Sequence, residues 1–400
     1  IVNNLKGRND KLHIALAHER LLIFKKSLFQ ERGLKLSDEK IKEFDKKDKD
    51  GNPIRLLGLR KRGGADTRTS RPNLFFPLYI SPKNGFVSTK KTTQSIQVFP
   101  KKSDGTDGCW RWGKNSVDLK HDMLLGKRSS TGKWDVFQID YLHIDGHLRR
   151  SKPKSVWAGA DYSSDSATKN FRKIMKDSKF TNPKSVELIK DIIDYSTGNE
   201  STILDFFAGS GTTGHAVLEL NKEDGGNRKF ILCTNDENNI CTQVCYPRIR
   251  NVIKGYTNDK KKKVAGLGGN LRYFKTDFVD AKDNQGNIKK LAEASTEILC
   301  LKEDCFDLKE KKKDFRAFSN PSGKIMCIID DYPGIKPCIA FINKIKSRIP
   351  DDETISVYEF SLGNTTSQDD FDEAGLGEDL VNLIPYPDGI RRTYDRCNSI

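Results

Sequence analysis

The sequence predicts an α/β fold built around a doubly wound parallel sheet. Two strand-like apolar runs, 202–206 and 229–233, flank a glycine-rich turn and a helix-like segment at about 212–221. This is the order of a βαβ unit, in which a helix connects two parallel strands. Helix-like segments at 166–178 and 185–195 precede the unit. The alternation of helices and strands favours this class over an all-α or all-β fold.

Length and composition bound the class of protein. The chain has 400 residues, a formal net charge of +15 and 36% hydrophobic residues, enough for two or three domains with cores. No run approaches the roughly 18 apolar residues of a membrane span, and no signal-peptide core opens the sequence. The nine cysteines are scattered without a Cys-x-x-Cys pair. We therefore expect a cytoplasmic protein with no disulfide framework and no metal site.

The basic excess lies in one half of the chain. Residues 1–200 hold 41 Lys+Arg against 24 Asp+Glu, whereas residues 201–400 hold 29 against 31. Such asymmetry indicates an anion-binding region joined to a near-neutral one, and nucleic acid is the commonest polyanion. A solvated basic face without a partner is the alternative.

The first 150 residues predict short elements. The apolar run 21–24 favours a buried strand, and 35–50 favours a short exposed helix that ends at the break 51–53. From 54 to 150, glycine, serine, threonine and aromatic residues favour short strands and long loops. Clear alternation occurs at 94–99 and 134–137.

The later segments are predicted in the same way. Val186, Ile189 and Ile193 recur at helical spacing, which supports the helix at 185–195. The run 260–269 combines lysines and glycines and predicts a loop. Beyond it, strands are expected at 324–329 and 355–360.

The strongest chemical signal is the turn between the two parallel strands. Gly209-Ser-Gly211-Thr-Thr-Gly214 satisfies G-x-G-x-x-G, a weak indication of dinucleotide binding when it stands alone. Asp205 closes the preceding strand, where its carboxylate would repel a pyrophosphate and attract an ammonium group. The glycines allow the backbone to approach a ligand closely. A cationic, amino-acid-bearing cofactor such as S-adenosylmethionine therefore fits better than NAD.

The end of the second strand carries further polar groups. Asn235, Asp236 and Glu237 lie about 25 residues after the glycines, where side chains can hydrogen-bond ribose hydroxyls. For Asp236 and Glu237, capping the N-terminus of the next helix is an equally good interpretation.

These residues carry a family resemblance. The run 205–213, Asp-Phe-Phe-Ala-Gly-Ser-Gly-Thr-Thr, resembles the S-adenosylmethionine motif of amino-group DNA methyltransferases. The surrounding sequence resembles the adenine-N6 methyltransferase (Mod) subunit of type III restriction-modification systems. The further matching stretches are 17–25, 180–184, 221–230, 238–248 and 269–278, and the 300–400 region resembles the Mod carboxyl-terminal domain.

The resemblance implies a Rossmann-like S-adenosylmethionine-dependent methyltransferase fold with an inserted α+β target-recognition domain and a small α+β carboxyl-terminal domain. It places the end of the catalytic-side part at 1–33, target recognition at 34–155, cofactor binding at 156–280 and subunit interaction at 281–400. The implied cofactor-binding residues are Asp205, Phe206, Phe207, Ala208, Gly209, Gly211, Thr212, Thr213, Lys184 and Asn235.

The catalytic motif of the resembled family is absent from the sequence. In that family an Asp-Pro-Pro-Tyr type motif precedes target recognition, and no Asp, Asn or Ser followed by Pro-Pro and an aromatic residue occurs here. The resemblance therefore implies a fragment whose catalytic motif lies upstream of Ile1. No catalytic residue is nominated. A smaller departure is Ser185, which follows Lys184 where the family has a second proline.

The implied function is transfer of a methyl group from S-adenosylmethionine to adenine N6 of double-stranded DNA, with a Mod homodimer and a helicase-nuclease Res subunit as partners. Residues 51–130 hold 16 Lys+Arg against 5 Asp+Glu, and we expect DNA contacts there from Arg60, Lys61, Arg62 and Arg68. A non-catalytic DNA-binding or assembly subunit and, on the glycine pattern alone, a dinucleotide-dependent oxidoreductase are the alternatives.

Overall fold

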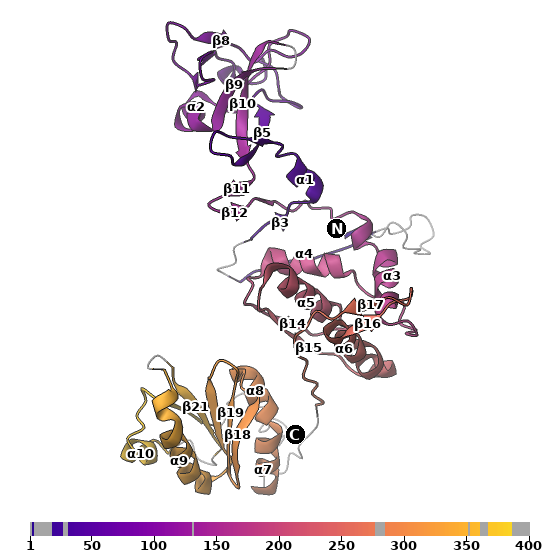
Figure 1. Ribbon diagram of the computed structural model, residues 1–400, viewed down its shortest axis with the longest axis vertical. Coiled ribbons are helices and arrows are strands. Elements are labelled where there is room, and N and C mark those ends of the chain that lie inside the picture. Colours follow the sequence, from indigo (N-terminus) through magenta and orange to yellow (C-terminus); the bar gives the residue numbers. More distant parts are fainter. Residues whose placement is uncertain are drawn as a thin grey trace. The chain divides into compact units, whose positions relative to one another are not determined.

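The computed structural model describes residues 2–3, 18–26, 31–129, 132–276, 285–350, 353–360 and 367–385. They form two compact units, 1–271 and 272–400 (Figure 1). Both units combine helices and sheets, so the fold is mixed α/β, as predicted at that level. No helix in the described ranges is long and apolar enough to cross a membrane.

The amino-terminal segment departs from its prediction. Strand β1 (Val2–Asn3) pairs antiparallel with β2 (His18–Glu19), and residues 20–26 have no regular structure. Leu22 is 73% and Phe24 is 87% exposed. The buried strand predicted at 21–24 is therefore wrong. Apolar composition favours burial, but no strand of the described chain pairs with this run. Most of the rest of the predicted segment 1–33 lies outside the described residues.

The basic region, residues 34–155, consists of short antiparallel strands. One sheet has the order β4-β5-β10-β9 and another has the order β7-β6-β8. The elements of these sheets are β4 (Lys46–Lys47), β5 (Pro53–Gly58), β6 (Leu78–Ile80), β7 (Val87–Ser88), β8 (Ile96–Val98), β9 (Leu124–Arg128) and β10 (Trp134–Tyr141). The remaining elements are α1 (Asp38–Lys42), α2 (Lys114–Leu119), the hairpin β11 (His143–Ile144) and β12 (His147–Leu148), and the pair β3 (Leu34–Lys35) and β13 (Arg150–Ser151). The predicted short strands are confirmed. The exposed helix predicted at 35–50 is confirmed only over Asp38–Lys42, because Lys46–Lys47 forms β4 and pairs with β5.

Two aromatic residues, Phe76 and Trp110, lie in the core of the basic region. Trp110 is fully buried and Phe76 is 4% exposed, together with Leu78, Val117 and Val136. Because β3 pairs with β13, the chain enters and leaves this region on adjacent strands.

Residues 156–271, the glycine-turn region, contain the predicted βαβ unit. Its elements are α3 (Ser164–Ile174), α4 (Val186–Ser196), β14 (Thr202–Asp205), α5 (Thr212–Asp224), β15 (Lys229–Leu232), α6 (Tyr246–Lys254) and the hairpin β16 (Gly255–Thr257) and β17 (Lys263–Ala265). β14 and β15 are parallel, with Asp205 opposite Leu232. Ser185 caps α4 by accepting a hydrogen bond from the Leu188 N–H at 3.2 Å. The predicted loop at 260–269 is partly wrong, because Lys263 begins β17.

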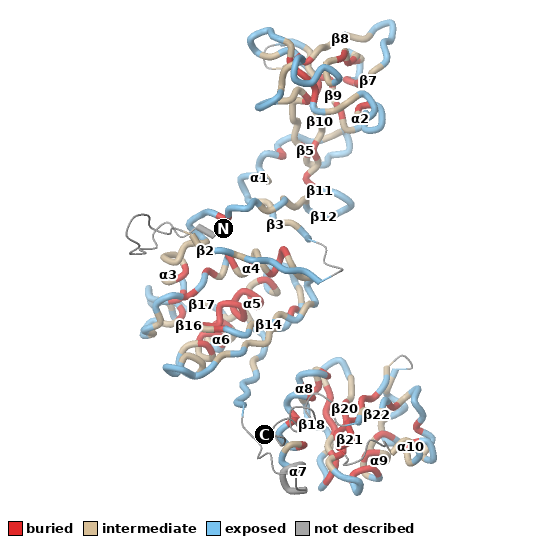
Figure 2. The backbone as a smooth tube through the Cα atoms, turned by 180° about the vertical axis from the view of Figure 1, so that it is seen from behind, coloured by how far each residue is buried: buried red, intermediate tan, exposed pale blue. Residues whose placement is uncertain are grey.

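Helix α5 is buried on nearly all sides (Figure 2). Ala216, Val217 and Leu220 pack with Ile193 of α4, and Leu218 packs with Ile249 of α6. The turn that precedes α5 is thereby attached to the most firmly packed helix of this region.

The unit 272–400 is a five-stranded mixed sheet with helices. Its elements are α7 (Gln285–Ala294), α8 (Thr296–Glu303), β18 (Asp307–Lys312), β19 (Phe315–Ser319), β20 (Ile325–Ile329), α9 (Ile335–Ile345), β21 (Ile355–Glu359), α10 (Gln368–Glu373) and β22 (Val381–Pro385). Strands β18, β19 and β20 are antiparallel, and β20, β21 and β22 are parallel. Alternate residues of β20 join two separate cores, which explains its continuous apolar run. The strands predicted at 324–329 and 355–360 are confirmed.

Candidate functional site at the glycine-rich turn

The turn from Ala208 to Gly211 connects β14 to α5. The structure explains why each of the three positions in the G-x-G-x-x-G pattern is a glycine. Gly209 and Gly211 adopt left-handed conformations with φ of 50° and 76°. A Cβ on Gly214 would lie 3.0 Å from side-chain atoms of both Ile249 and Leu232. At Gly209 the nearest atom to an added Cβ is the Phe207 carbonyl oxygen at 3.8 Å. Space for a ligand therefore remains beside Gly209, whereas Gly214 serves helix packing.

Asp205 is held in place by the turn that follows it. Its Oδ1 accepts a hydrogen bond from the Phe207 N–H at 3.0 Å, and its Oδ2 accepts one from the Thr213 hydroxyl at 2.6 Å. The side chain is half-buried at the carboxyl end of β14. Each carboxylate oxygen has a second lone pair, so both can still accept a hydrogen bond from a ligand.

Two aromatic rings beside this carboxylate lie in solvent. Phe206 is 65% exposed and Phe207 is 93% exposed, whereas Ala208 is buried and donates its N–H to the Cys233 carbonyl at 3.1 Å. Thr212 and Thr213 are buried in the first turn of α5. The structure therefore combines a carboxylate, two exposed rings and side-chain-free backbone at one sheet edge. An aromatic face attracts a cation, as does a carboxylate.

Lys184 and Asn235, the two other predicted cofactor residues, have different hydrogen-bond partners. The Lys184 carbonyl accepts a hydrogen bond from the Thr212 hydroxyl at 3.4 Å, but its ammonium group lies 2.6 Å from Glu19 Oε2. Asn235 is exposed and donates to Glu237 Oε2 at 3.4 Å.

Asp236 Oδ1 accepts hydrogen bonds from the backbone N–H groups of Cys241 and Thr242, at the start of the π-helical turn Cys241–Cys245 that leads into α6. Of the two interpretations left open by the sequence, capping is the one that this geometry supports for Asp236.

Arg248 is a functional candidate that sequence reasoning missed. This side chain of α6 is 1% exposed and lies beneath the turn. Its Nη1 donates to the Ser210 carbonyl at 3.2 Å, to the Ser210 hydroxyl at 3.0 Å and to the Thr212 hydroxyl at 2.9 Å. Burial lowers the pKa of Arg248 to about 10, so the guanidinium stays charged at neutral pH. The signal in the sequence was an arginine on the face of a helix that also carries Ile249 and Val252.

The network continues through His215. Arg248 Nη2 lies 3.3 Å from His215 Nδ1, and His215 Nε2 lies 3.0 Å from Glu219 Oε1. Because an arginine can only donate, Nδ1 must accept, and the proton of the neutral ring is then on Nε2. Burial lowers the pKa of His215 below its usual 6.5, which keeps the ring neutral. Glu219 Oε2 contacts the Lys190 ammonium group at 3.2 Å and so joins α4 to α5.

A cavity of about 990 Å³ lies in the same region. It is lined by residues of the loop 174–181, of the segment 237–244 and of α6 and β16 at 251–257. The first two segments contain parts of the predicted motif stretches 180–184 and 238–248. Their convergence provides room for a small molecule beside the segment 237–244.

The four predicted DNA-binding residues have unequal freedom. Arg60 is half-buried and donates to the Lys61 carbonyl at 3.3 Å, whereas Arg62 is exposed. Arg68 donates to Asp107 Oδ2 at 3.1 Å and lies 4.4 Å from the centroid of the Phe75 ring. Lys61 and Arg62 are therefore better placed than Arg68 to meet a phosphate.

Cysteines in the described ranges carry free thiols. Burial raises the pKa of Cys245 to about 11, so this thiol is not a nucleophile at neutral pH. In the same ranges, no three His, Cys, Asp or Glu side chains are grouped so as to hold a metal ion. Cys397 lies outside the described residues.

A family model described as DNA methylase matches residues 3–244, which include the basic region and the glycine turn. The chain belongs to the DNA methylase family. The type II methyltransferase M.KpnI of Klebsiella pneumoniae is 31% identical to this methylase chain over 280 residues, which cover 70% of the chain and 65% of the relative. The EcoPI Mod subunit of Escherichia phage P1, a type III restriction-modification enzyme, is 32% identical over 246 residues, 59% of the chain and 37% of the relative.

The StyLTI Mod subunit of Salmonella typhimurium is 42% identical over 91 residues, 23% of the methylase chain and 14% of the relative. The predicted resemblance to restriction-modification methyltransferases, Mod subunits among them, is thereby confirmed. The chain spans less than two thirds of the length of each of these three relatives.

Proposed function

We propose that this methylase chain is part of an S-adenosylmethionine-dependent methyltransferase that modifies adenine N6 in double-stranded DNA within a restriction-modification system. The observation that carries the proposal is the tethered carboxylate of Asp205 beside the open backbone at Gly209, within the range matched by the methylase family. The parallel β14–α5–β15 unit supports a Rossmann-like, doubly wound sheet around this turn.

The residues at the turn fit S-adenosylmethionine. Asp205 would accept hydrogen bonds from its ammonium group, and the rings of Phe206 and Phe207 would face its positive charge. Ala208, Gly209 and Gly211 would let the backbone approach it, with Thr212 and Thr213 fixing the start of α5. Lys184 would contribute through its backbone, and Asn235 would hydrogen-bond a ribose hydroxyl. The cofactor, when bound, supplies an electrophilic methyl group.

The same residues argue against a dinucleotide. A pyrophosphate carries negative charge, and Asp205 would repel it at the sheet edge where dinucleotides bind. The chain's own task in methyl transfer is then to hold the donor in one orientation, because fixing two reactants in line removes much of the barrier. We assign no catalytic residue, since the Pro-Pro-aromatic motif of the resembled family does not occur in these 400 residues.

The basic region suits target recognition. Lys61 and Arg62 would contact phosphates, with smaller contributions from the engaged Arg60 and Arg68. Methylation of an exocyclic base nitrogen also requires the base to leave the duplex, at a cost of a few kcal/mol. We assign target recognition to 34–155, the end of the catalytic side to 1–33, cofactor binding to 156–280 and subunit interaction to 281–400. A Mod homodimer and a Res subunit in the cytoplasm are the proposed setting.

The test is equilibrium binding of labelled S-adenosylmethionine to the full chain and to Asp205→Asn. We expect saturable binding that NAD does not displace and that Asp205→Asn weakens at least tenfold. The control Asp104→Asn changes a loop carboxylate of the basic region and should bind as the parent does. Displacement by NAD would favour the oxidoreductase alternative. Salt-dependent DNA binding without any S-adenosylmethionine binding would favour a non-catalytic DNA-binding subunit.

A further inference from the structure

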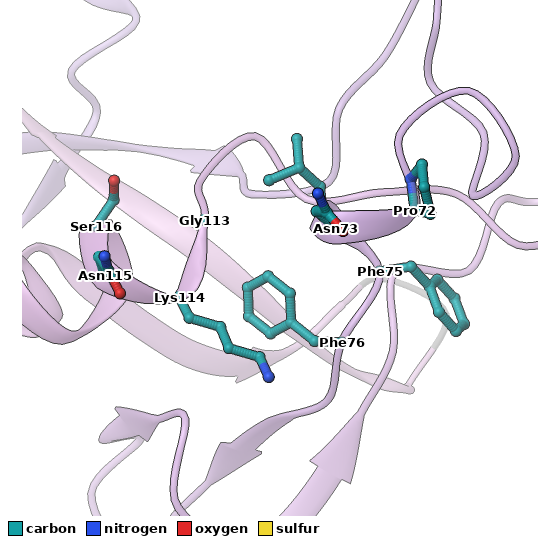
Figure 3. Close-up of a pocket in the computed structure, with 9 residues that line it drawn as sticks. Pro72, Asn73, Phe75, Phe76, Gly113, Lys114, Asn115 and Ser116 are labelled. Atoms are coloured by element: carbon teal, nitrogen blue, oxygen red, sulfur yellow. The ribbon is translucent and has the colours of Figure 1, made fainter.

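A pocket of about 540 Å³ lies in the basic region between the segments 72–76 and 113–116 (Figure 3). Figure 3 shows Asn73 on one side and Asn115 with Ser116 on the other, with Lys114 and the Phe76 ring between them. None of these residues is among the four predicted DNA contacts, Arg60, Lys61, Arg62 and Arg68. The pocket therefore presents a second group of polar side chains on the most basic part of the chain.

The backbone on which these side chains stand is fixed. Trp110, which is fully buried, donates its backbone N–H to the Leu74 carbonyl at 2.9 Å and its indole N–H to the Phe76 carbonyl at 2.8 Å. Phe76 itself is 4% exposed. Since Gly113 follows Trp110 by only three residues, one buried side chain positions both walls of the pocket. Such preorganisation is what a recognition site needs.

The polar groups in the pocket are available for a ligand. Within the described ranges the side chains of Asn73 and Asn115 have no hydrogen-bond partner, and both are exposed. Lys114 Nζ has no carboxylate partner there and lies 5.6 Å from the centroid of the Phe76 ring. Arg68, by contrast, is engaged by Asp107. The pocket thus offers two carboxamides and an ammonium group that, within the described ranges, is held by the Phe76 ring and by no carboxylate.

We infer that this pocket reads base edges of duplex DNA, whereas Lys61 and Arg62 contact phosphates. The inference rests on the proposed function and assigns its sequence-reading residues. An asparagine carboxamide matches the N6 and N7 atoms of adenine in the major groove, and a lysine ammonium group matches O6 and N7 of guanine. The surrounding excess of 16 Lys+Arg over 5 Asp+Glu in residues 51–130 supplies the attraction that a polyanion requires.

The test is selection of bound duplexes from a randomised DNA pool by the full chain and by the double variant Asn73→Ala/Asn115→Ala. The parent should enrich a consensus. The double variant should lose discrimination at one or two positions, by roughly 5- to 150-fold, while keeping its non-specific affinity and the slope of its salt dependence. Lys114→Ala should relax a guanine position. The matched control Lys90→Ala, an exposed lysine outside the pocket, should keep the consensus.

An unchanged consensus in both pocket variants would overturn the inference and leave DNA binding intact. A parent chain that binds DNA with a steep salt slope but enriches no consensus would overturn it as well. Absence of salt-dependent binding by the parent would instead refute the proposed function. Circular dichroism and the preserved non-specific affinity show that a variant is folded, so lost discrimination cannot be attributed to unfolding.

Discussion

Arg248→Met should weaken cofactor binding while leaving the chain folded. The substitution removes three donated N–H groups: two on Nη1, which the Ser210 carbonyl, the Ser210 hydroxyl and the Thr212 hydroxyl share, and one on Nη2, which His215 Nδ1 accepts. At about 1.5 kcal/mol each, these contribute roughly 4.5 kcal/mol. Burial lowers the Arg248 pKa to about 10, a change that corresponds to roughly 3 kcal/mol against burying its charge. The difference predicts a loss of only about 1–2 kcal/mol in the free energy of unfolding.

The substitution also removes the side chain that holds the turn in place. If one or two turn residues must be ordered again when the cofactor binds, at about 1–2 kcal/mol each, affinity falls by about 2 kcal/mol, or roughly 30-fold. Equilibrium dialysis with labelled S-adenosylmethionine measures the dissociation constant, and thermal unfolding measures stability in parallel. Arg248→Lys, which keeps the charge, should recover part of the affinity.

The matched control is Arg250→Met, two residues along α6 and exposed, which should change neither quantity. Unchanged affinity in Arg248→Met would refute the positioning role. So would a collapse of the melting temperature large enough to account for the lost binding, since Arg248 would then serve the fold alone.

Three further predictions concern stability. The folded pKa of His215 lies below 6.5, so near that pH the unfolded chain binds more protons than the folded chain. The free energy of unfolding should therefore fall as the pH drops below about 6.5. Thermal melts at pH 7.5 and 5.5 should show a smaller fall in His215→Gln than in the parent. Gly214→Ala should lower the free energy of unfolding in urea by about 1–3 kcal/mol, because its Cβ meets two side chains. Gly64→Ala, with open space around it, should be near neutral. Equal losses in the two variants would exclude the packing argument. Glu303→Gln should lower the free energy of unfolding by about 2–4 kcal/mol, because buried Glu303 accepts hydrogen bonds from Tyr358 and Lys324. Glu297→Gln, at an exposed position, should leave it unchanged. Identical thermal melts for the two variants would contradict the role of Glu303.

The elements that could be predicted from sequence are those fixed by local pattern. The strand, glycine turn and helix at 202–224 were predictable, because alternation, left-handed glycines and helical spacing all act over a few residues. The strand expected at 21–24 failed because an apolar run does not reveal whether a neighbouring strand exists.

The remainder of the candidate site depends on distant partners. Arg248 contacts Ser210 and Thr212, which lie 38 and 36 residues earlier, and nothing local indicates that it folds beneath the turn. Arg68 looked free in sequence but is engaged by Asp107, 39 residues later. Contacts of this kind decide which charges are available to a ligand, and only the fold reveals them.

The central claim is that the glycine turn holds the methyl donor. Photo-crosslinking of tritiated S-adenosylmethionine to the full chain, followed by peptide mapping, tests it most directly. We expect label in the peptide that contains Phe206 and Phe207, competed by unlabelled cofactor but not by NAD, and lost in Asp205→Asn. Label confined to the unit 272–400, or label at the turn that survives Asp205→Asn undiminished, would contradict the account.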